Sequence, residues 1–167
     1  YNTAVGYAAG LSVTSGVNNT LIGGLAGDAL TTAYSNVGVG YLALSSDTKG
    51  VRSVAIGQSA LEAQNFSSAI TNTYNVAVGY SAGGAVTTGI RNVLIGGLAG
   101  DALQDADFNV GVGYGALSAD TLGSGSVAIG DFTLVNQNFT SATTTYNTAV
   151  GYAAGSAVTT GTNNTFI

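Results

Sequence analysis

The chain has no cysteine, histidine, methionine, tryptophan or proline, and only 7% of its residues are charged. Without cysteine or histidine there is no thiol nucleophile, no Ser-His-Asp triad, no zinc site of the usual kind and no disulfide framework. Three basic residues stand against eight acidic ones, a formal charge of −5. We therefore expect no nucleic-acid partner, no cofactor, no metal and no enzymatic activity.

Long hydrophobic runs are also missing. Segments such as Leu21–Gly27 are far too short to cross a bilayer, so we expect no membrane insertion. Hydrophobic residues still make up 46% of the 167 residues, which is enough for a core despite the 26 glycines. The first residue is not methionine and the last lies inside a repeated motif, so we expect a fragment of a longer fibre.

A short motif recurs along the whole chain: Asn or Ser, any residue, a small or apolar residue, Val or Ile, then Gly. Most copies are 17 residues apart, and every fourth interval is 22 or 21. The motif glycines are Gly6, Gly23, Gly40, Gly57, Gly79, Gly96, Gly113, Gly130 and Gly151. Internal periodicity of this kind indicates a repeat architecture.

Four short units make one large repeat, because glycines four motifs apart are separated by 73 and then 72 residues. Tyr1–Gly10 returns letter for letter as Tyr146–Gly155. The single repeat region 1–167 therefore divides into large repeats at about 1–73, 74–145 and a partial 146–167.

Each unit has the composition of one coil of a β-solenoid. Asn75–Tyr80 alternates like a short strand, a small-residue corner follows, and Ala85–Thr88 suits a second strand. Glycine suits corners that need a positive φ or a close backbone approach. In pairs such as Asn18-Asn19 and Asn163-Asn164, asparagine suits left-handed turns and stacked amide ladders. The sequence predicts an all-β, parallel β-solenoid (β-roll) of about ten coils of 17–22 residues.

Both faces of the motif strand are apolar or small, which is typical of a strand buried on both sides. One face carries Val5, Ile22, Val39 and Ile56. The other carries Ala4, Leu21, Gly38 and Ala55. We expect the first face to fill the coil interior and the small-residue face to pack outward against sister chains, most simply in a homotrimer. The alternative is a wide monomer with both walls packed internally.

Two sets of strings resemble known repeats. Ser53–Gly57 and Ser126–Gly130 resemble the head repeat of trimeric autotransporter adhesins, whereas Asn2–Tyr7 and Asn163–Ile167 resemble repeats of phage tail fibres. The resemblance implies a trimeric, left-handed β-roll in an extracellular attachment fibre, on a virion or a bacterial surface. Other parts of the fibre would bind a host glycan or protein. The 17-residue unit with periodic 21–22-residue units departs from the adhesin pattern.

Carboxylates are the only acid–base candidates: Asp28, Asp47, Glu62, Asp101, Asp105, Asp107, Asp120 and Asp131. Asp28 and Asp101 occupy equivalent repeat positions, as do Asp47 and Asp120, which indicates turn residues. Asp105 and Asp107 suit either a Ca²⁺ site or a solvated loop.

The longer fourth unit predicts loops at 62–73 and 135–145 that bulge from the rod. Their Phe66 and Phe139 either anchor the loop or contact a sugar or a neighbouring fibre. Five tyrosines follow motif glycines and are expected to stack as an aromatic ladder. They are Tyr7, Tyr41, Tyr80, Tyr114 and Tyr152.

These observations predict the structural shaft of a trimeric attachment fibre that projects a host-binding tip. The first alternative is a bacterial adhesin head whose own surface binds matrix or cells. An ice-binding solenoid would need a regular Thr array, which Thr87-Thr88 and Thr159-Thr160 only partly supply. A polysaccharide depolymerase would need a pair of catalytic carboxylates.

Overall fold

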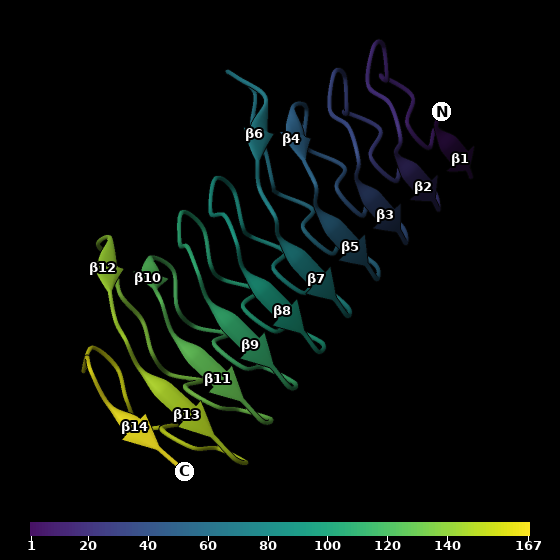
Figure 1. Cartoon of the computed structure of the whole chain (residues 1–167). Coiled ribbons are helices and arrows are strands. Elements are labelled where there is room, and N and C mark those ends of the chain that lie inside the picture. The colour runs from purple at the N-terminus through teal and green to yellow at the C-terminus, as the bar shows by residue number, and fades with distance from the viewer.

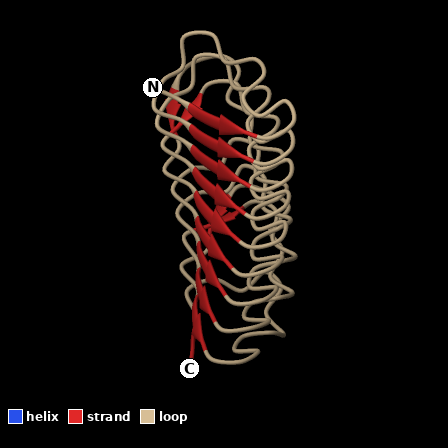
Figure 2. Ribbon diagram, turned by 90° about the vertical axis from the view of Figure 1, so that its right-hand side faces the viewer, coloured by secondary structure: helices blue, strands red, loops and turns tan.

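The computed structural model describes all 167 residues as a rod of stacked coils without any helix (Figures 1 and 2). One ten-stranded parallel sheet runs along the rod. Its strands, in spatial order, are β1 (Thr3–Val5), β2 (Thr20–Ile22), β3 (Val37–Val39), β5 (Val54–Ile56), β7 (Val76–Val78), β8 (Val93–Ile95), β9 (Val110–Val112), β11 (Val127–Ile129), β13 (Thr148–Val150) and β14 (Thr165–Phe166). The all-β parallel solenoid of about ten coils is confirmed.

The long coils keep the register of the sheet. Ordinary coils pair residues 17 apart, such as Thr3 with Thr20, and the long coil pairs Val54 with Val76. The added residues of the long coils lie outside the main sheet, where two small parallel sheets form. These pair β4 (Gly50–Val51) with β6 (Thr71–Asn72), and β10 (Gly123–Ser124) with β12 (Thr143–Thr144). Figure 1 shows both pairs standing apart from the main sheet.

The second strand expected in every coil is present in only four coils, as β4, β6, β10 and β12. In the other coils it is absent, and Ala85–Thr88, for example, forms turns and bends instead. The coil-to-coil backbone ladder nevertheless continues there, because Ala85 N donates to Asp101 O at 3.0 Å and Thr87 N to Gln104 O at 3.1 Å. A 17-residue coil needs several tight turns, which leaves only three residues for one regular strand. The small sheets appear only where a long coil supplies extra chain.

The two faces of the strand are reversed relative to the prediction. The middle residues, such as Leu21 and Ala55, are fully buried, whereas Ile22 and Ile56 face outward. In this strand-middle column each leucine pairs with a glycine in the next coil, Leu21 with Gly38 and Leu94 with Gly111. A Cβ on Gly38 would lie 3.2 Å from Leu21 Cδ2, so Leu21 fills the space that Gly38 leaves. The Ala, Leu and Gly column is therefore core and not a contact between chains.

The motif glycines allow successive coils to touch. All nine have φ between +125° and +140°. A Cβ on Gly57 would lie 2.3 Å from the carbonyl oxygen of Gly79 in the next coil. A side chain at this corner would therefore meet both backbone strain and a direct clash, which explains why glycine recurs there.

Asparagines form a buried ladder beside the sheet. Asn19 Oδ1 accepts from Asn36 N at 3.0 Å, and Asn19 Nδ2 donates to Ala33 O at 2.9 Å. Asn18 has a φ of +59° and Asn163 a φ of +58°. Both expected roles of these asparagine pairs, left-handed turn and amide ladder, are confirmed.

Candidate functional site

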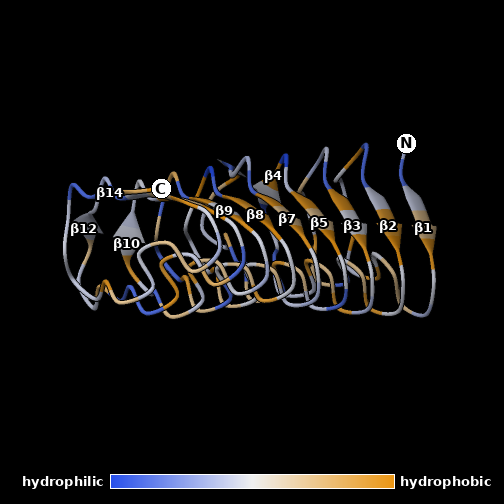
Figure 3. Cartoon of the chain, turned by 90° about the horizontal axis from the view of Figure 1, so that it is seen from below, coloured by the Kyte–Doolittle hydropathy of each residue, from blue (hydrophilic) through white to orange (hydrophobic).

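The most extended surface feature is the outer side of the ten-stranded sheet, here called the outer face. It consists of the first and third residues of each strand and the tyrosines that follow alternate motif glycines. Its aliphatic members are Val5, Ile22, Val37, Val39, Val54, Ile56, Val76, Val78, Val93, Ile95, Val110, Val112, Val127, Ile129 and Val150. Figure 3 shows the hydrophobic colour of these strands continuing from coil to coil.

The outer face is solvent-exposed in the single chain and carries almost no charge. Ile56 and Ile95 are each 39% exposed and Tyr80 is 57% exposed. All three Lys and Arg residues lie outside it, and Asp131 is the one charged residue in the position after the motif glycine. Monomeric proteins rarely expose a continuous apolar patch larger than a few hundred Å².

The tyrosines do not form the predicted continuous ladder. They occupy every second coil, and Tyr41 extends over Gly24 as Tyr114 does over Gly97. Their rings are thus two coil spacings apart, about 10 Å, which is too far for mutual stacking. The only ring pairs in this column are edge-on contacts of Phe132 with Tyr114 and Tyr152, at 5.5 and 6.2 Å between centroids. The tyrosines instead widen the outer face.

Each long coil is held by a buried polar cluster that sequence reasoning missed. Gln64 replaces the missing amide where Ser53 interrupts the asparagine ladder. Gln64 Nε2 donates to Asp47 Oδ2 at 2.6 Å and to Ser53 Oγ at 3.0 Å, and its Oε1 accepts from Asn75 Nδ2 at 2.8 Å. The second large repeat contains the same cluster. Its members are Asp120, Ser126, Gln137, Thr145 and Asn147.

The carboxylates at positions 47 and 120 brace turns and loops. Asp47 Oδ1 accepts from Gly50 N at 3.0 Å and from Phe66 N at 3.1 Å. Asp120 makes the same contacts in the second repeat, to Gly123 N and Phe139 N. The recurring Gln-Asn-Phe and the change from Asn to Ser were the sequence signals for this cluster.

The two loop phenylalanines differ in exposure. Phe139 is buried with 6% of its surface exposed, whereas Phe66 is half-buried. The anchor role therefore describes Phe139 well and Phe66 in part. In the first loop the exposed apolar side chain is Ile70, at 53%, beside Ser68, whose carbonyl accepts from Lys49 Nζ at 3.5 Å.

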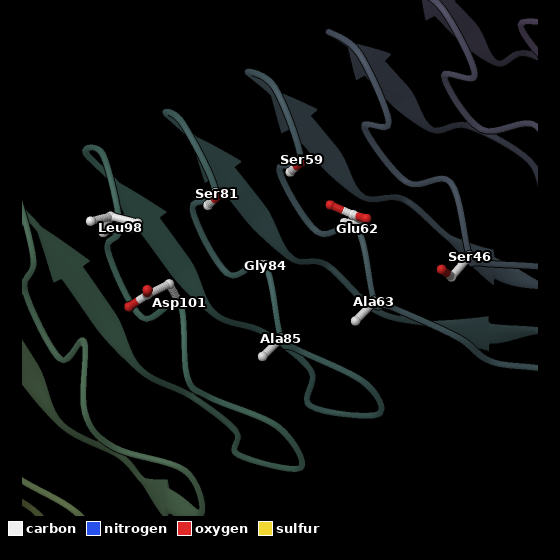
Figure 4. Close-up of a pocket in the computed structure, with 9 residues that line it drawn as sticks. All are labelled: Ser46, Ser59, Glu62, Ala63, Ser81, Gly84, Ala85, Leu98 and Asp101. Carbon is white, nitrogen blue, oxygen red and sulfur yellow. The ribbon is translucent and has the colours of Figure 1, made fainter.

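A shallow groove crosses the coils on another wall of the rod and brings Glu62 and Asp101 to its opposite sides (Figure 4). Burial raises the pKa of Asp101, and its Oδ1 atom has no hydrogen-bond partner. The second large repeat has Val135 at the position of Glu62, so the groove is not repeated.

Asp105 and Asp107 contact the preceding coil. Thr88 Oγ1 donates to Asp105 Oδ1 at 2.8 Å, and Ile90 N donates to Asp107 Oδ1 at 2.7 Å. Nowhere do three or more Asp or Glu side chains meet in a group that would hold a metal ion. A helix able to cross a bilayer is absent from the structure.

Comparison of the chain with protein-family models, with curated proteins and with solved structures gave no match. The geometry of the outer face and of the long coils is thus the basis for any functional conclusion.

Proposed function

We propose that this chain is a segment of the structural shaft of an extracellular homotrimeric attachment fibre, tail-fibre-like, which projects a host-binding tip. The observation that carries the proposal is the exposed, nearly uncharged outer face. The sequence resemblance to trimeric fibre repeats is the reason for proposing three chains and an extracellular location. The proposal assigns the chain no reaction.

The size of the outer face suits a second copy of the chain as its occupant. Ten strands at about 4.8 Å give a length of about 45 Å, and the strand with its tyrosine adds a width of about 15 Å. In a trimer this footprint of roughly 700 Å² on each chain would be shared between its two neighbours, and three such faces would bury about 2,100 Å² in all, which lies in the range of stable assemblies. Copies of this chain also share the same coil rise, so their Val and Ile columns match along the whole rod.

The mechanism of a shaft is mechanical. Backbone hydrogen bonds link each coil to the next along the axis, and the asparagine ladder adds side-chain bonds in the same direction. Bending the rod would stretch many of these bonds at once. An apolar seam between parallel copies would add resistance that salt does not screen, unlike that of surface ion pairs.

A bacterial adhesin head is the second candidate. The observation that favours it is the exposed first loop, where Ser67–Ile70 stands open to solvent. A surface that binds cells or matrix directly would use such loops. Loss of adhesion after replacement of Ile70 in an otherwise intact trimer would favour this candidate over a passive shaft.

The native mass of the chain at micromolar concentration tests the proposal. We expect a three-chain species, and a single-chain species for Ile95→Lys, because burying one ammonium per chain in an apolar seam is costly. Ser46→Lys is the matched control, since Ser46 is exposed on another wall, and it should remain trimeric. A monomeric wild-type chain, or equal effects of the two lysines, would contradict the proposal.

A further inference from the structure

A column of left-handed residues runs along the rod just before the asparagine ladder. Its members have φ between 51° and 77°. They are Asn18, Ser35, Arg52, Tyr74, Arg91, Phe108, Gly125, Tyr146 and Asn163. Their side chains belong neither to the core nor to the outer face. They therefore remain accessible to a ligand when both of those surfaces are covered.

In the first large repeat this column holds a filled cation slot. The guanidinium carbon of Arg52 lies 5.4 Å from the ring centroid of Tyr34 and 5.8 Å from that of Tyr74. Both distances are within the range of cation–π attraction. The chain therefore already binds a guanidinium group between residues of the two neighbouring coils.

In the second large repeat the same slot is open. Gly125 stands 73 residues after Arg52, and a pocket of about 350 Å³ lies there. The pocket is lined by Asp107, Phe108, Ser124, Gly125, Thr144 and Tyr146. The backbone is unchanged, because Arg52 N donates to Tyr34 O at 3.3 Å and Gly125 N donates to Asp107 O at 2.9 Å.

The open slot also has a carboxylate that the filled one lacks, since Asp107 stands where the first repeat has Tyr34. Asp107 is fixed in place: its Oδ1 accepts from Ile90 N at 2.7 Å, and its own N donates to Ser124 Oγ at 2.9 Å. The other oxygen, Oδ2, accepts no hydrogen bond from the chain.

The aromatic walls come from the coils on either side of Gly125. Phe108 and Tyr146 are two coil spacings apart, about 10 Å, which leaves room for one planar group between them. Arg91 lies over the Phe108 ring with its guanidinium carbon 5.3 Å from the centroid, so this ring already attracts a guanidinium group.

We propose that the Gly125 slot binds a guanidinium cation, the side chain of an arginine on a partner peptide or protein. The planar cation would lie between Phe108, which stands where the first repeat has Ser35, and Tyr146, the counterpart of Tyr74, and would donate to Asp107 Oδ2. Arginine suits both contacts because its planar group stacks on rings and forks onto carboxylates. This site goes beyond the shaft function and does not depend on the number of chains.

The first repeat supplies a variant that closes the site. In Gly125→Arg the chain would fill its own slot, as Arg52 does. A Cβ at Gly125 would lie 3.6 Å from Thr144 Cγ2 and 3.9 Å from Tyr146 Cδ1, which are ordinary contacts. Arg52 tolerates a φ of 65° where Gly125 has 77°, so we expect the variant to fold.

A second variant removes only the charge. Asp107→Asn keeps an oxygen that accepts from Ile90 N, and it abolishes the carboxylate that faces the ligand. We expect at least tenfold weaker binding. Loss of folding is not expected for either variant, and a circular dichroism melt of each checks this.

The experiment is a titration of the protein with N-acetyl-arginine amide, followed by NMR shifts of the Tyr146 and Phe108 rings. N-acetyl-citrulline amide, which has nearly the same shape without the charge, is the control ligand. We expect saturable arginine binding, citrulline binding at least tenfold weaker, and no saturable binding to Gly125→Arg.

Three results would overturn the proposal. They are absence of saturable arginine binding, equal binding of citrulline, and binding that persists in Gly125→Arg. Titration with a neutral disaccharide is the last arm, and a disaccharide that binds while arginine does not would make the slot a sugar clamp. The native mass is measured separately, so failure here leaves the trimer test unaffected.

Discussion

The two large repeats have nearly the same interior, apart from changes such as Ala60 to Thr133, and different exteriors. The clusters around Gln64 and Gln137 use the same residue types and the same contacts, and nearly equal distances hold each loop. On the surface, the first repeat has Arg52 where the second has Gly125, and Glu62 where the second has Val135. The interior therefore sets the path of the coil, and the surface varies on that fixed path. Single variants at equivalent positions of the two repeats test whether the interiors respond alike while the surfaces differ.

The largest expected effect is at the motif glycines. Gly57→Ala and Gly130→Ala would each force a Cβ to within 2.3 or 2.6 Å of the next carbonyl oxygen, in a left-handed conformation. We expect each to lower the free energy of unfolding by about 4 kcal/mol, the sum of strain and overpacking. Urea melts of both variants measure this loss, which should be equal in the two repeats.

Gly151→Ala is the control for the close approach. Gly151 has a φ of +125°, but the 167-residue chain stops before the next motif glycine, so nothing lies within 4 Å of its Cβ position in this chain. It should lose only the backbone-strain part, about 1–3 kcal/mol. A loss as large as that of Gly57→Ala would show that the contact between coils contributes nothing.

Next come the buried glutamines. Gln64→Leu and Gln137→Leu would each remove a donor from a buried carboxylate, so we expect a loss of about 3 kcal/mol in each. Thermal melts compare them with Gln104→Leu, an exposed glutamine away from the outer face, which should change stability little. Unequal losses at positions 64 and 137 would contradict the equivalence of the two clusters.

The loop phenylalanines should contribute unequally to the stability of the two repeats. Phe139→Ala removes a buried ring and is expected to cost about 2 kcal/mol, because the ring covers a loop and not the main core. Phe66→Ala should cost about half of that, since Phe66 is only half-buried. Chemical denaturation of both variants shows which one loses more free energy of unfolding. A greater loss for Phe66→Ala would contradict the burial seen here.

The smallest effect is at Asp101. Burial raises the pKa of its carboxyl in the folded state, so ionisation disfavours the fold and stability falls as pH rises through the folded pKa. Asp101→Asn stays neutral and should be slightly more stable than wild type at neutral pH. The difference should vanish below the pKa of the unfolded chain. Melting temperatures across the acid range check both signs.

The sequence predicted the solenoid, its register and the asparagine ladder, because these follow directly from the repeat period. It placed Ile22 and not Leu21 in the interior, and this was wrong, since a three-residue strand with apolar residues on both faces gives no contrast. The available space inside a 17-residue coil decides this, and only the structure shows that space. Aligning the repeats reveals that Gly125 replaces Arg52, but not that rings lie on both sides.

Labelling of a single engineered thiol tests the burial of the outer face most directly, because the chain has no cysteine of its own. Ile95→Cys is compared with Ser46→Cys for reaction with a bulky maleimide at micromolar protein concentration. We expect Ile95→Cys to react at least tenfold more slowly, because sister chains would cover it while Ser46→Cys stays open. Equal rates at the two positions would contradict the account.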